Sequence, residues 1–248
     1  MNPYSSIICD DFSVYVYHNT KMELPTRRET VLHFFESLRK MYPRMTEFET
    51  RESGEYALEE DHEDNSYRWT ALEARRICSG YVNPPGLEEA DAYHERILEV
   101  APVHLDSSML DCEALDVVYA FDLMCSGNHD EVVADALGLH PALENLVQSA
   151  GKQVLNFQPS LMLALDESCR LQSRLTIETR TNPYQVRTGQ YSELPLSVYF
   201  TVRQYWERQP YASFQESYRH QRQLCQDIVD NHIIPAIVQP LSQTINSR

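Results

Sequence analysis

Four histidine and acidic side chains between residues 104 and 113 are of types that bind metal ions or transfer protons. They are His104, Asp106, Asp111 and Glu113. Imidazole nitrogens and carboxylate oxygens are common metal ligands, and a loop between a helix and a central strand is a place where such groups can converge. We therefore treat all four as candidate metal ligands, and His104 and Asp106 also as candidate catalytic groups. The alternative is a capping or surface role.

A cysteine and a histidine four residues apart form a second candidate pair. Cys125 follows a strongly apolar segment, and His129 stands where a helix is expected to begin. A nucleophilic thiol needs a nearby base, and an imidazole near the positive end of a helix can transfer protons. Cys125 and His129 are thus the other candidate catalytic residues. The alternative is an inert buried thiol beside an exposed histidine.

Acidic side chains are concentrated in one short stretch. Nine acids and one base, Arg51, lie between Glu47 and Asp64. Such a cluster speeds the encounter with an oppositely charged surface. We predict that the tip of this stretch would face a basic protein surface, through Glu59, Asp61, Glu63 and Asp64. A solvated hairpin without a partner is the alternative interpretation.

Arginines and tyrosines suggest a further binding surface. The chain has 15 tyrosines, and Arg170, Arg174 and Arg180 recur along residues 170–180. Guanidinium groups and aromatic rings together can bind an anionic or aromatic ligand. The same pattern is also typical of the solvated face of an antiparallel sheet, so both interpretations stay open.

The charge balance excludes several classes of partner. The net charge is −16, and residues 1–124 hold 25 acids against 11 bases, which leaves only −2 for residues 125–248. A field of this sign repels phosphate, so we expect neither nucleic acid nor an anionic membrane as a partner. The seven glycines never occur as G-x-G. No glycine-rich phosphate-binding loop is therefore present, and we expect no cofactor.

The remaining composition is typical of an intracellular protein. The first 11 residues lack a basic region, and no apolar run approaches the roughly 18–20 residues of a membrane span. The six cysteines are widely spaced, without a C-x-x-C pair, which favours reduced and mostly buried thiols. We expect a cytoplasmic location.

Hydrophobic periodicity predicts the elements that position these residues. Helical spacing and capping signals predict helices over residues 26–42, 87–101, 129–137, 141–150 and 213–234, the last of them bent or ended at Pro235 and extending to residue 245 if it resumes. Period-two or β-branched segments predict strands over residues 13–17, 46–60, 67–78, 115–124, 154–165, 170–180 and 196–206.

The order of these elements predicts an α+β fold, with a largely antiparallel sheet and helices packed on one face. Residues 13–124 give the order βαββαβ of a ferredoxin-like plait. One interpretation is therefore two ferredoxin-like halves, residues 1–113 and 114–248, that share one continuous core. A single mixed domain without internal symmetry is the alternative.

Two classes of function follow from the sequence. The first is a non-enzymatic binding or scaffold protein, because catalytic signatures are missing and the N-terminal half is acidic. The second is a small-molecule enzyme, metal-assisted in one version, that uses histidine and acidic side chains of residues 104–131. The oligomeric state does not follow from the sequence.

Overall fold

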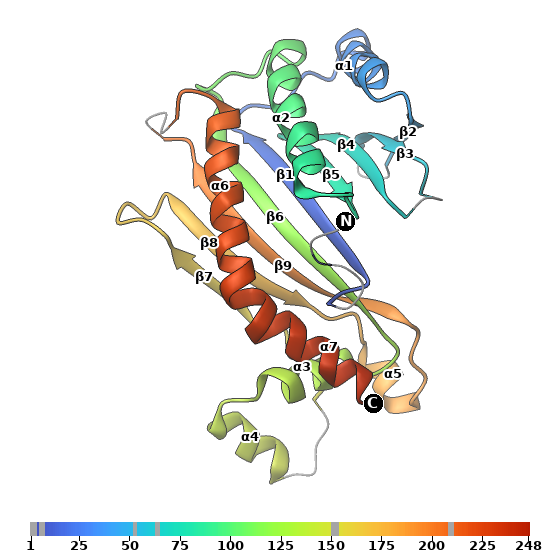
Figure 1. Ribbon diagram of the computed structural model, residues 1–248. Coiled ribbons are helices and arrows are strands. Elements are labelled where there is room, and N and C mark those ends of the chain that lie inside the picture. The colour runs from blue at the N-terminus through green and yellow to red at the C-terminus, as the bar shows by residue number, and fades with distance from the viewer. Residues whose placement is uncertain (1–3, 5–7, 52–53, 63–64, 150–153, 208–210) are drawn as a thin grey trace.

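The computed structural model describes residues 1–248 apart from 1–3, 5–7, 52–53, 63–64, 150–153 and 208–210. Its described residues form one nine-stranded sheet in the order β2-β3-β4-β5-β1-β6-β9-β8-β7 (Figure 1). Every neighbouring pair of strands is antiparallel. The prediction of an α+β protein built on a largely antiparallel sheet is confirmed.

The strands are β1 (Asp11–Thr20), β2 (Met45–Thr50), β3 (Tyr56–Glu60), β4 (Tyr67–Glu73), β5 (Arg76–Val82), β6 (Cys112–Cys125), β7 (Ser160–Ala164), β8 (Leu171–Glu178) and β9 (Leu194–Tyr205). The helices are α1 (Arg28–Met41), α2 (Leu87–His104), α3 (His129–Leu137), α4 (Pro141–Gln148), α5 (Pro183–Thr188), α6 (Phe214–Ile228) and α7 (Gln239–Asn246), with a π-helical segment, η2 (Val229–Val238), between the last two.

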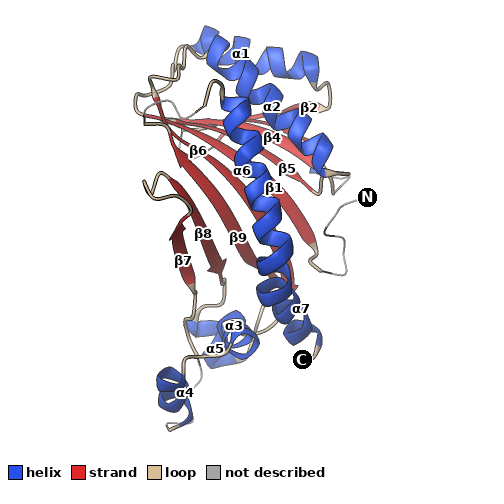
Figure 2. Cartoon of the chain, turned by 60° about the vertical axis from the view of Figure 1, so that its left-hand side comes forward, coloured by secondary structure: helices blue, strands red, loops and turns tan. Residues whose placement is uncertain are grey.

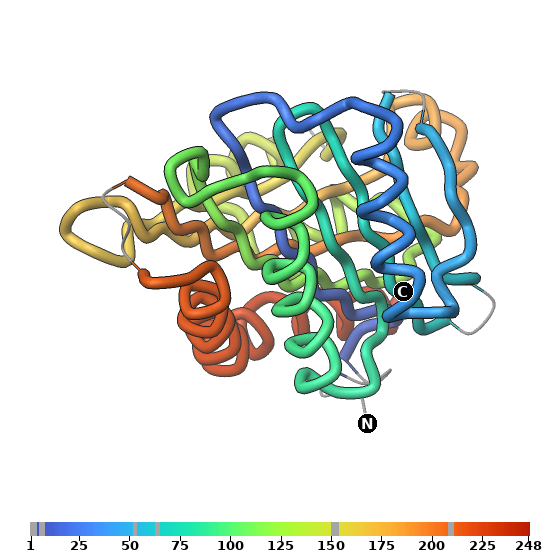
Figure 3. The backbone as a smooth tube through the Cα atoms, turned by 90° about the horizontal axis from the view of Figure 1, so that it is seen from above, coloured from blue at the N-terminus to red at the C-terminus, as the bar shows by residue number. Residues whose placement is uncertain are grey.

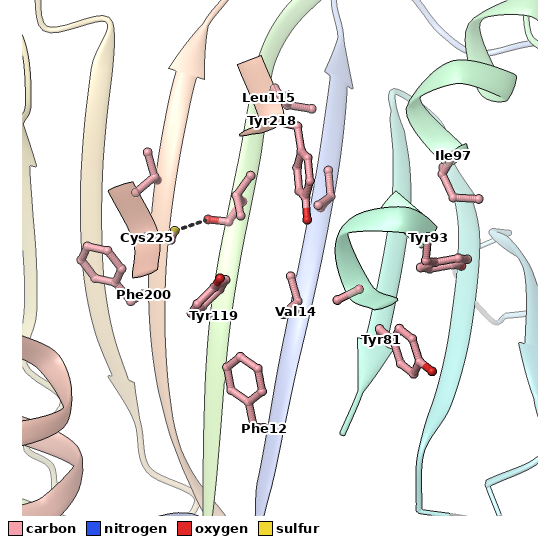
Figure 4. Packing of buried hydrophobic residues seen from close by; sticks show 14 of the residues in the cluster. Phe12, Val14, Tyr81, Tyr93, Ile97, Leu115, Tyr119, Phe200, Tyr218 and Cys225 are labelled. Atoms are coloured by element: carbon pink, nitrogen blue, oxygen red, sulfur yellow. Dashed lines mark hydrogen bonds between the residues drawn. The ribbon is translucent and has the colours of Figure 1, made fainter. Parts of the chain in front are cut away.

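One face of the sheet is covered by helices. Figure 2 shows α1, α2 and α6 in front of the curved sheet, and α3, α4 and α5 beyond one end of it. Alternate residues of the two central strands point toward this helical layer, among them the fully buried Phe12 and Tyr119. Figure 4 shows these rings beside Tyr218 and Cys225 of α6. We call this side the covered face.

The opposite side of the sheet, which we call the open face, has no described helix packed on it (Figures 2 and 3). Along each strand, the residues of the open face alternate with those of the covered face. Tyr15 and Tyr17 of β1 are examples. Within the described ranges, no helix combines the length and the apolar character that crossing a bilayer requires.

The first half contains more strands than the sequence indicated. The two long strands expected over residues 46–60 and 67–78 are each replaced by a hairpin, β2–β3 and β4–β5, so four strands separate α1 from α2. Gly54, with φ +84°, lies in the first turn, as its freedom at positive φ favours. The second turn, at Ala74 and Arg75, has no glycine or proline to signal it. The order βαββαβ is therefore not observed in this half.

Helix ends also differ in places from the sequence prediction. α1 was expected to begin at residue 26, but it begins after Arg27 and has no side-chain cap. α2 continues through Pro102 to His104: Pro102 lacks the N–H that would bond to Leu98, but Leu105 still donates to the carbonyl of Ala101 at 2.9 Å. Pro235 lies inside η2, so the helix neither stops nor restarts there. α5, which the sequence analysis missed, begins with a capping box at Asn182.

The predicted division between residues 113 and 114 falls inside β6, the strand that joins the two sides of the sheet. One cluster of buried apolar residues includes members from both sides, such as Val14 and Val202. The division into two units stays a prediction.

Candidate functional site

The strand register places three polar side chains in one row on the open face. Tyr17 of β1 lies opposite Asp116 of β6, and Asp116 lies opposite Arg203 of β9. Because antiparallel partners point to the same face, these side chains meet although they are far apart in the sequence.

Asp116 and Arg203 form a two-pronged ion pair. Arg203 Nε and Nη2 each donate to a different oxygen of Asp116 at 2.6 Å, and Asn19 Nδ2 donates to Asp116 Oδ2 at 3.2 Å. The Asp116 side chain is 4% exposed and that of Arg203 is 39% exposed. The hydrogen bonds to Asp116 raise the pKa of Arg203, so the guanidinium of Arg203 stays protonated at neutral pH.

Arg76 approaches the same row from β5. Its Nε and Nη2 donate to the two oxygens of Glu73 at 2.8 and 2.7 Å, which holds its guanidinium 4.9 Å from the ring centre of Tyr17. Glu73 and Arg76 are also the register pair that closes the β4–β5 turn. The turn that the sequence did not signal thus fixes the position of this cation.

Arg174 supplies a third cation, from β8. Its register partners are Thr201 on β9 and Met162 on β7, which places its side chain on the open face. It is exposed, and within the described part of the chain it has no ion-pair partner. Arg170 pairs with Glu207 at 3.3 Å, and Arg180 donates to Ser197 Oγ at 2.8 Å. Of the three arginines noted along residues 170–180, Arg174 is therefore the one left for a ligand.

These groups line a pocket of about 170 Å³ on the open face. Its lining includes Tyr17, Arg76, Asp116, Arg174, Arg203 and Tyr205. Three guanidinium groups thus surround one lining carboxylate, in a chain of net charge −16. A larger hollow of about 480 Å³, beside the start of α1, contains Glu55, Glu73 and Glu113 next to two arginines, so it has no excess of positive charge.

Aromatic rings continue the open face away from this pocket. Tyr15 stacks on Tyr17 with ring centres 6.4 Å apart and contacts Trp69 at 5.7 Å. The indole of Trp69 lies directly over Gly80, its register partner on β5, where any Cβ atom would collide with the ring. The glycine is required here by the close approach of the indole.

Two of the four candidate metal ligands of residues 104–113, His104 and Asp111, have separate local partners. His104 Nδ1 lies 3.1 Å from Nδ1 of His33 on α1, and burial together with this neighbour lowers the pKa of His104. Asp106 has a positive φ of 52°, and Asp111 accepts the backbone N–H of Met22 at 2.9 Å. The Glu113 side chain lies on the surface. Among the described residues, no group of three or more His, Cys, Asp or Glu side chains is placed to hold a metal ion.

The candidate pair Cys125 and His129 is close in space, but the imidazole contacts the backbone rather than the thiol. His129 Nε2 lies 3.2 Å from the Cys125 carbonyl, and its Nδ1 accepts the N–H of Arg180 at 3.3 Å. The buried ring is thus held neutral, with its proton on Nε2, and burial lowers the pKa of His129. Burial also raises the pKa of the Cys125 thiol, which disfavours the reactive thiolate.

The acidic tip is partly neutralised by its own neighbours. Glu59 is 13% exposed and is bonded to Arg51 and to His62, the latter at 3.1 Å. Asp61 is exposed. Glu63 and Asp64 lie outside the described residues. On the neighbouring edge strand, Glu47 and Glu49 are exposed and share a shallow hollow with Glu59 and Asp61.

The sequence analysis missed most of the pocket. Asp116, Arg203 and Tyr205 lie on strands that it did predict, at positions that alternate with buried apolar residues. Charged side chains at alternate positions of two otherwise apolar strands were the available signal. Comparison with models of known protein families returns no match, and comparison with curated proteins returns none either.

Proposed function

We propose that the protein is a non-enzymatic binding protein whose open-face pocket takes the anionic group of a ligand. The observation that carries this proposal is the excess of cations in the pocket of a strongly acidic chain, with Arg174 left without a protein carboxylate. Because Arg174 is exposed and has no ion-pair partner among the described residues, its guanidinium can bind an anion from solution. A carboxylate or a phosphate matches the planar guanidinium donors.

The size of the pocket limits what it can hold. At about 170 Å³ it is smaller than the roughly 300–1,000 Å³ of pockets that enclose a whole small molecule. It fits a terminal group, with an aromatic or apolar part of the ligand lying along Tyr17 and Tyr205. The ligand class is therefore an aromatic carboxylate or phosphate, or a larger molecule that ends in one.

The alternative of a metal-assisted enzyme has less support. His104 contacts another histidine, Asp111 is engaged by the backbone of Met22, and His129 by backbone groups. Each of these three groups thus already has a local structural partner. A catalytic site would need several of them to face one substrate.

Calorimetric titration with three probes tests the binding proposal. Benzoate and phenyl phosphate carry the expected anion, whereas benzyl alcohol carries the ring alone. We expect the two anions to bind, and Arg174→Gln to weaken them about tenfold or more, since a hydrogen bond to a charged group is lost. The control is Arg187→Gln, which removes an exposed arginine that lies 5.4 Å from the Tyr184 ring, outside the pocket. The proposal would be rejected if the protein bound all three probes equally well, or if the two variants bound the anions equally well.

A second binding surface is supported by the acidic edge of the sheet. Glu47, Glu49 and Asp61 are exposed there, and we propose a basic protein surface as their partner. Glu59 contributes less charge, because it is only 13% exposed and is already paired with Arg51. If a basic partner is found, Glu47→Gln with Glu49→Gln should slow association at low salt and leave its rate at high salt unchanged. An unchanged rate at low salt would refute this role.

We also propose, from topology alone, that the chain consists of two related halves. β1 and β6 are the central strands, β5 and β9 are their outer neighbours, and α2 and α6 lie together on the covered face. The four strands between α1 and α2 distinguish the first half from a ferredoxin-like plait.

A further inference from the structure

β7 is an edge strand with an unusual surface. It ends the sheet beyond β8, and all five of its residues are exposed. Leu161, Met162 and Leu163 are 55%, 58% and 50% exposed. Residues 154–165 contain no charged side chain at all. Edge strands of soluble proteins are normally protected by charge, proline or a covering element, so an apolar edge of this kind indicates an interaction surface.

The backbone of β7 defines which groups are available at this edge. Pro159 accepts the N–H of Ile177 at 3.1 Å, and Leu165 donates to Leu171 at 2.8 Å. Because alternate residues of an antiparallel strand bond to the same neighbour, Leu161 and Leu163 also face β8. The N–H and C=O groups of Ser160, Met162 and Ala164 therefore point outward, away from the sheet.

We propose that a second copy of this chain pairs with β7 in antiparallel fashion, about a two-fold axis at Met162. The segment reads Ser-Leu-Met-Leu-Ala, so its pattern of residue size is the same in both directions. In this register Met162 meets Met162 of the copy, and Ser160 meets Ala164. All three are outward-pointing residues, so each can exchange both backbone hydrogen bonds. Leu161 then lies opposite Leu163, where side chains of antiparallel strands approach most closely.

Charge favours a second copy at this edge and opposes one at the other. The opposite edge strand, β2, carries Glu47 and Glu49, so two copies would repel each other there. The excess charge of the chain belongs to residues 1–124, whereas β7 belongs to the nearly neutral remainder. A five-residue strand contact buries less than the roughly 1,200 Å² of a stable interface, so the dimer should be weak and dependent on concentration.

Sedimentation velocity over a concentration series of the full chain tests this pairing. We expect the mass to rise from 28.8 kDa toward twice that value as the concentration increases. Leu163→Lys places a charge on the edge without touching the pocket of the open face, and should keep the chain monomeric. Thr46→Lys, on the exposed β2 edge, is the matched control and should dimerise like the wild type. A monomer at all concentrations up to about 1 mM would overturn the proposal.

A second variant separates strand pairing from simple apolar association. Ala164→Pro removes an outward N–H and keeps both leucines, so it should weaken the dimer about tenfold or more. If this variant fails to fold, hydrogen exchange of the wild type gives the same information. The amides of Met162 and Ala164 should become protected only at high concentration. Unweakened dimerisation of a folded Ala164→Pro variant, or amide exchange that does not depend on concentration, would overturn the strand register. Anion binding to the Leu163→Lys variant reports separately on the proposed function.

Discussion

On the covered face His18 and His94 are buried and neutral, whereas on the open face the buried Asp116 is paired with Arg203, which is 39% exposed. His18 packs against Phe214 with ring centres 4.4 Å apart, and neither of its nitrogens has a hydrogen-bond partner among the described residues. Asp116, by contrast, has both oxygens bonded to Arg203, which reaches water. His18 and Asp116 lie on neighbouring strands of the same sheet, and helices cover only the face to which His18 belongs.

This contrast shows what the helical layer does. Helices exclude most water from the covered face, so a histidine without a charged partner stays neutral there, and burial lowers the pKa of His18 to about 4 and of His94 to about 3. An ion pair on that face, Glu60–Arg68, is enclosed, with side chains 2% and 20% exposed. On the open face water reaches one partner of the Asp116–Arg203 pair and the exposed Arg174, so guanidinium groups there can bind an anion from solution.

The largest expected difference between the faces concerns stability. Phe121→Ala empties a fully buried site on the covered face and should lower the free energy of unfolding by about 3–5 kcal/mol. Tyr205→Ala removes a half-buried ring of the open face and should cost less than half as much, because water can enter its place. Urea unfolding of both variants measures this difference. Equal losses would show that the two faces are equally closed to water.

Acidification should lower the stability of the fold through the buried histidines of the covered face. The unfolded chain protonates its histidines near pH 6.5, whereas folded His18 and His94 stay neutral down to about pH 4 and 3. The unfolded state therefore binds more protons below pH 6.5, and stability falls as the pH decreases. Between pH 7 and pH 5 each histidine should cost about 2 kcal/mol. His18→Phe should remove its share of this loss in urea unfolding at the two pH values. An unaltered pH dependence would contradict the assignment.

The Asp116–Arg203 ion pair should contribute less to the free energy of unfolding than a large side chain of the core, but more than an ion pair on the surface. Asp116→Asn leaves the guanidinium of Arg203 without its anion and should cost about 1–2 kcal/mol, below the value for a fully buried pair because Arg203 is partly exposed. Glu95→Gln is the matched control: Glu95 binds Arg219 with the same two-pronged geometry, but Arg219 is 65% exposed. That change should cost less than about 1 kcal/mol. If thermal unfolding showed similar losses of stability for both variants, the partly buried pair would contribute no more than the surface pair.

The smallest expected effect concerns the aromatic part of the open face. Gly80→Ala forces the indole of Trp69 away from the sheet and should cost about 1 kcal/mol, since the half-exposed ring can move outward. Trp206 is 2% exposed and lies on the covered face. Its fluorescence should therefore stay constant, while that of Trp69 shifts to the red. Single-tryptophan variants separate the two signals. An unshifted Trp69 emission would show that the ring does not lie on Gly80 in solution.

The sequence by itself determined the fold class and most of the elements, because these depend on neighbours along the chain. Period-two alternation marked β8 and β9, and Asn128 and Ser213 marked the starts of α3 and α6, where both accept backbone N–H groups as expected. The β4–β5 turn escaped detection because its stability comes from the pairing of Glu73 with Arg76 and from the strands around it. No local signal distinguishes such a turn from a continuous strand.

Only the tertiary structure decided which residues form the candidate site. Tyr17, Asp116 and Arg203 come from three strands, and it is the strand register that places them in one row. The acidic tip and residues 104–113 were conspicuous in the sequence because their charges are close together along the chain. The pocket was not conspicuous, because each strand contributes only one or two of its polar groups. Long-range pairing gathers these groups, and they stay accessible to a ligand because none of the described helices covers the open face.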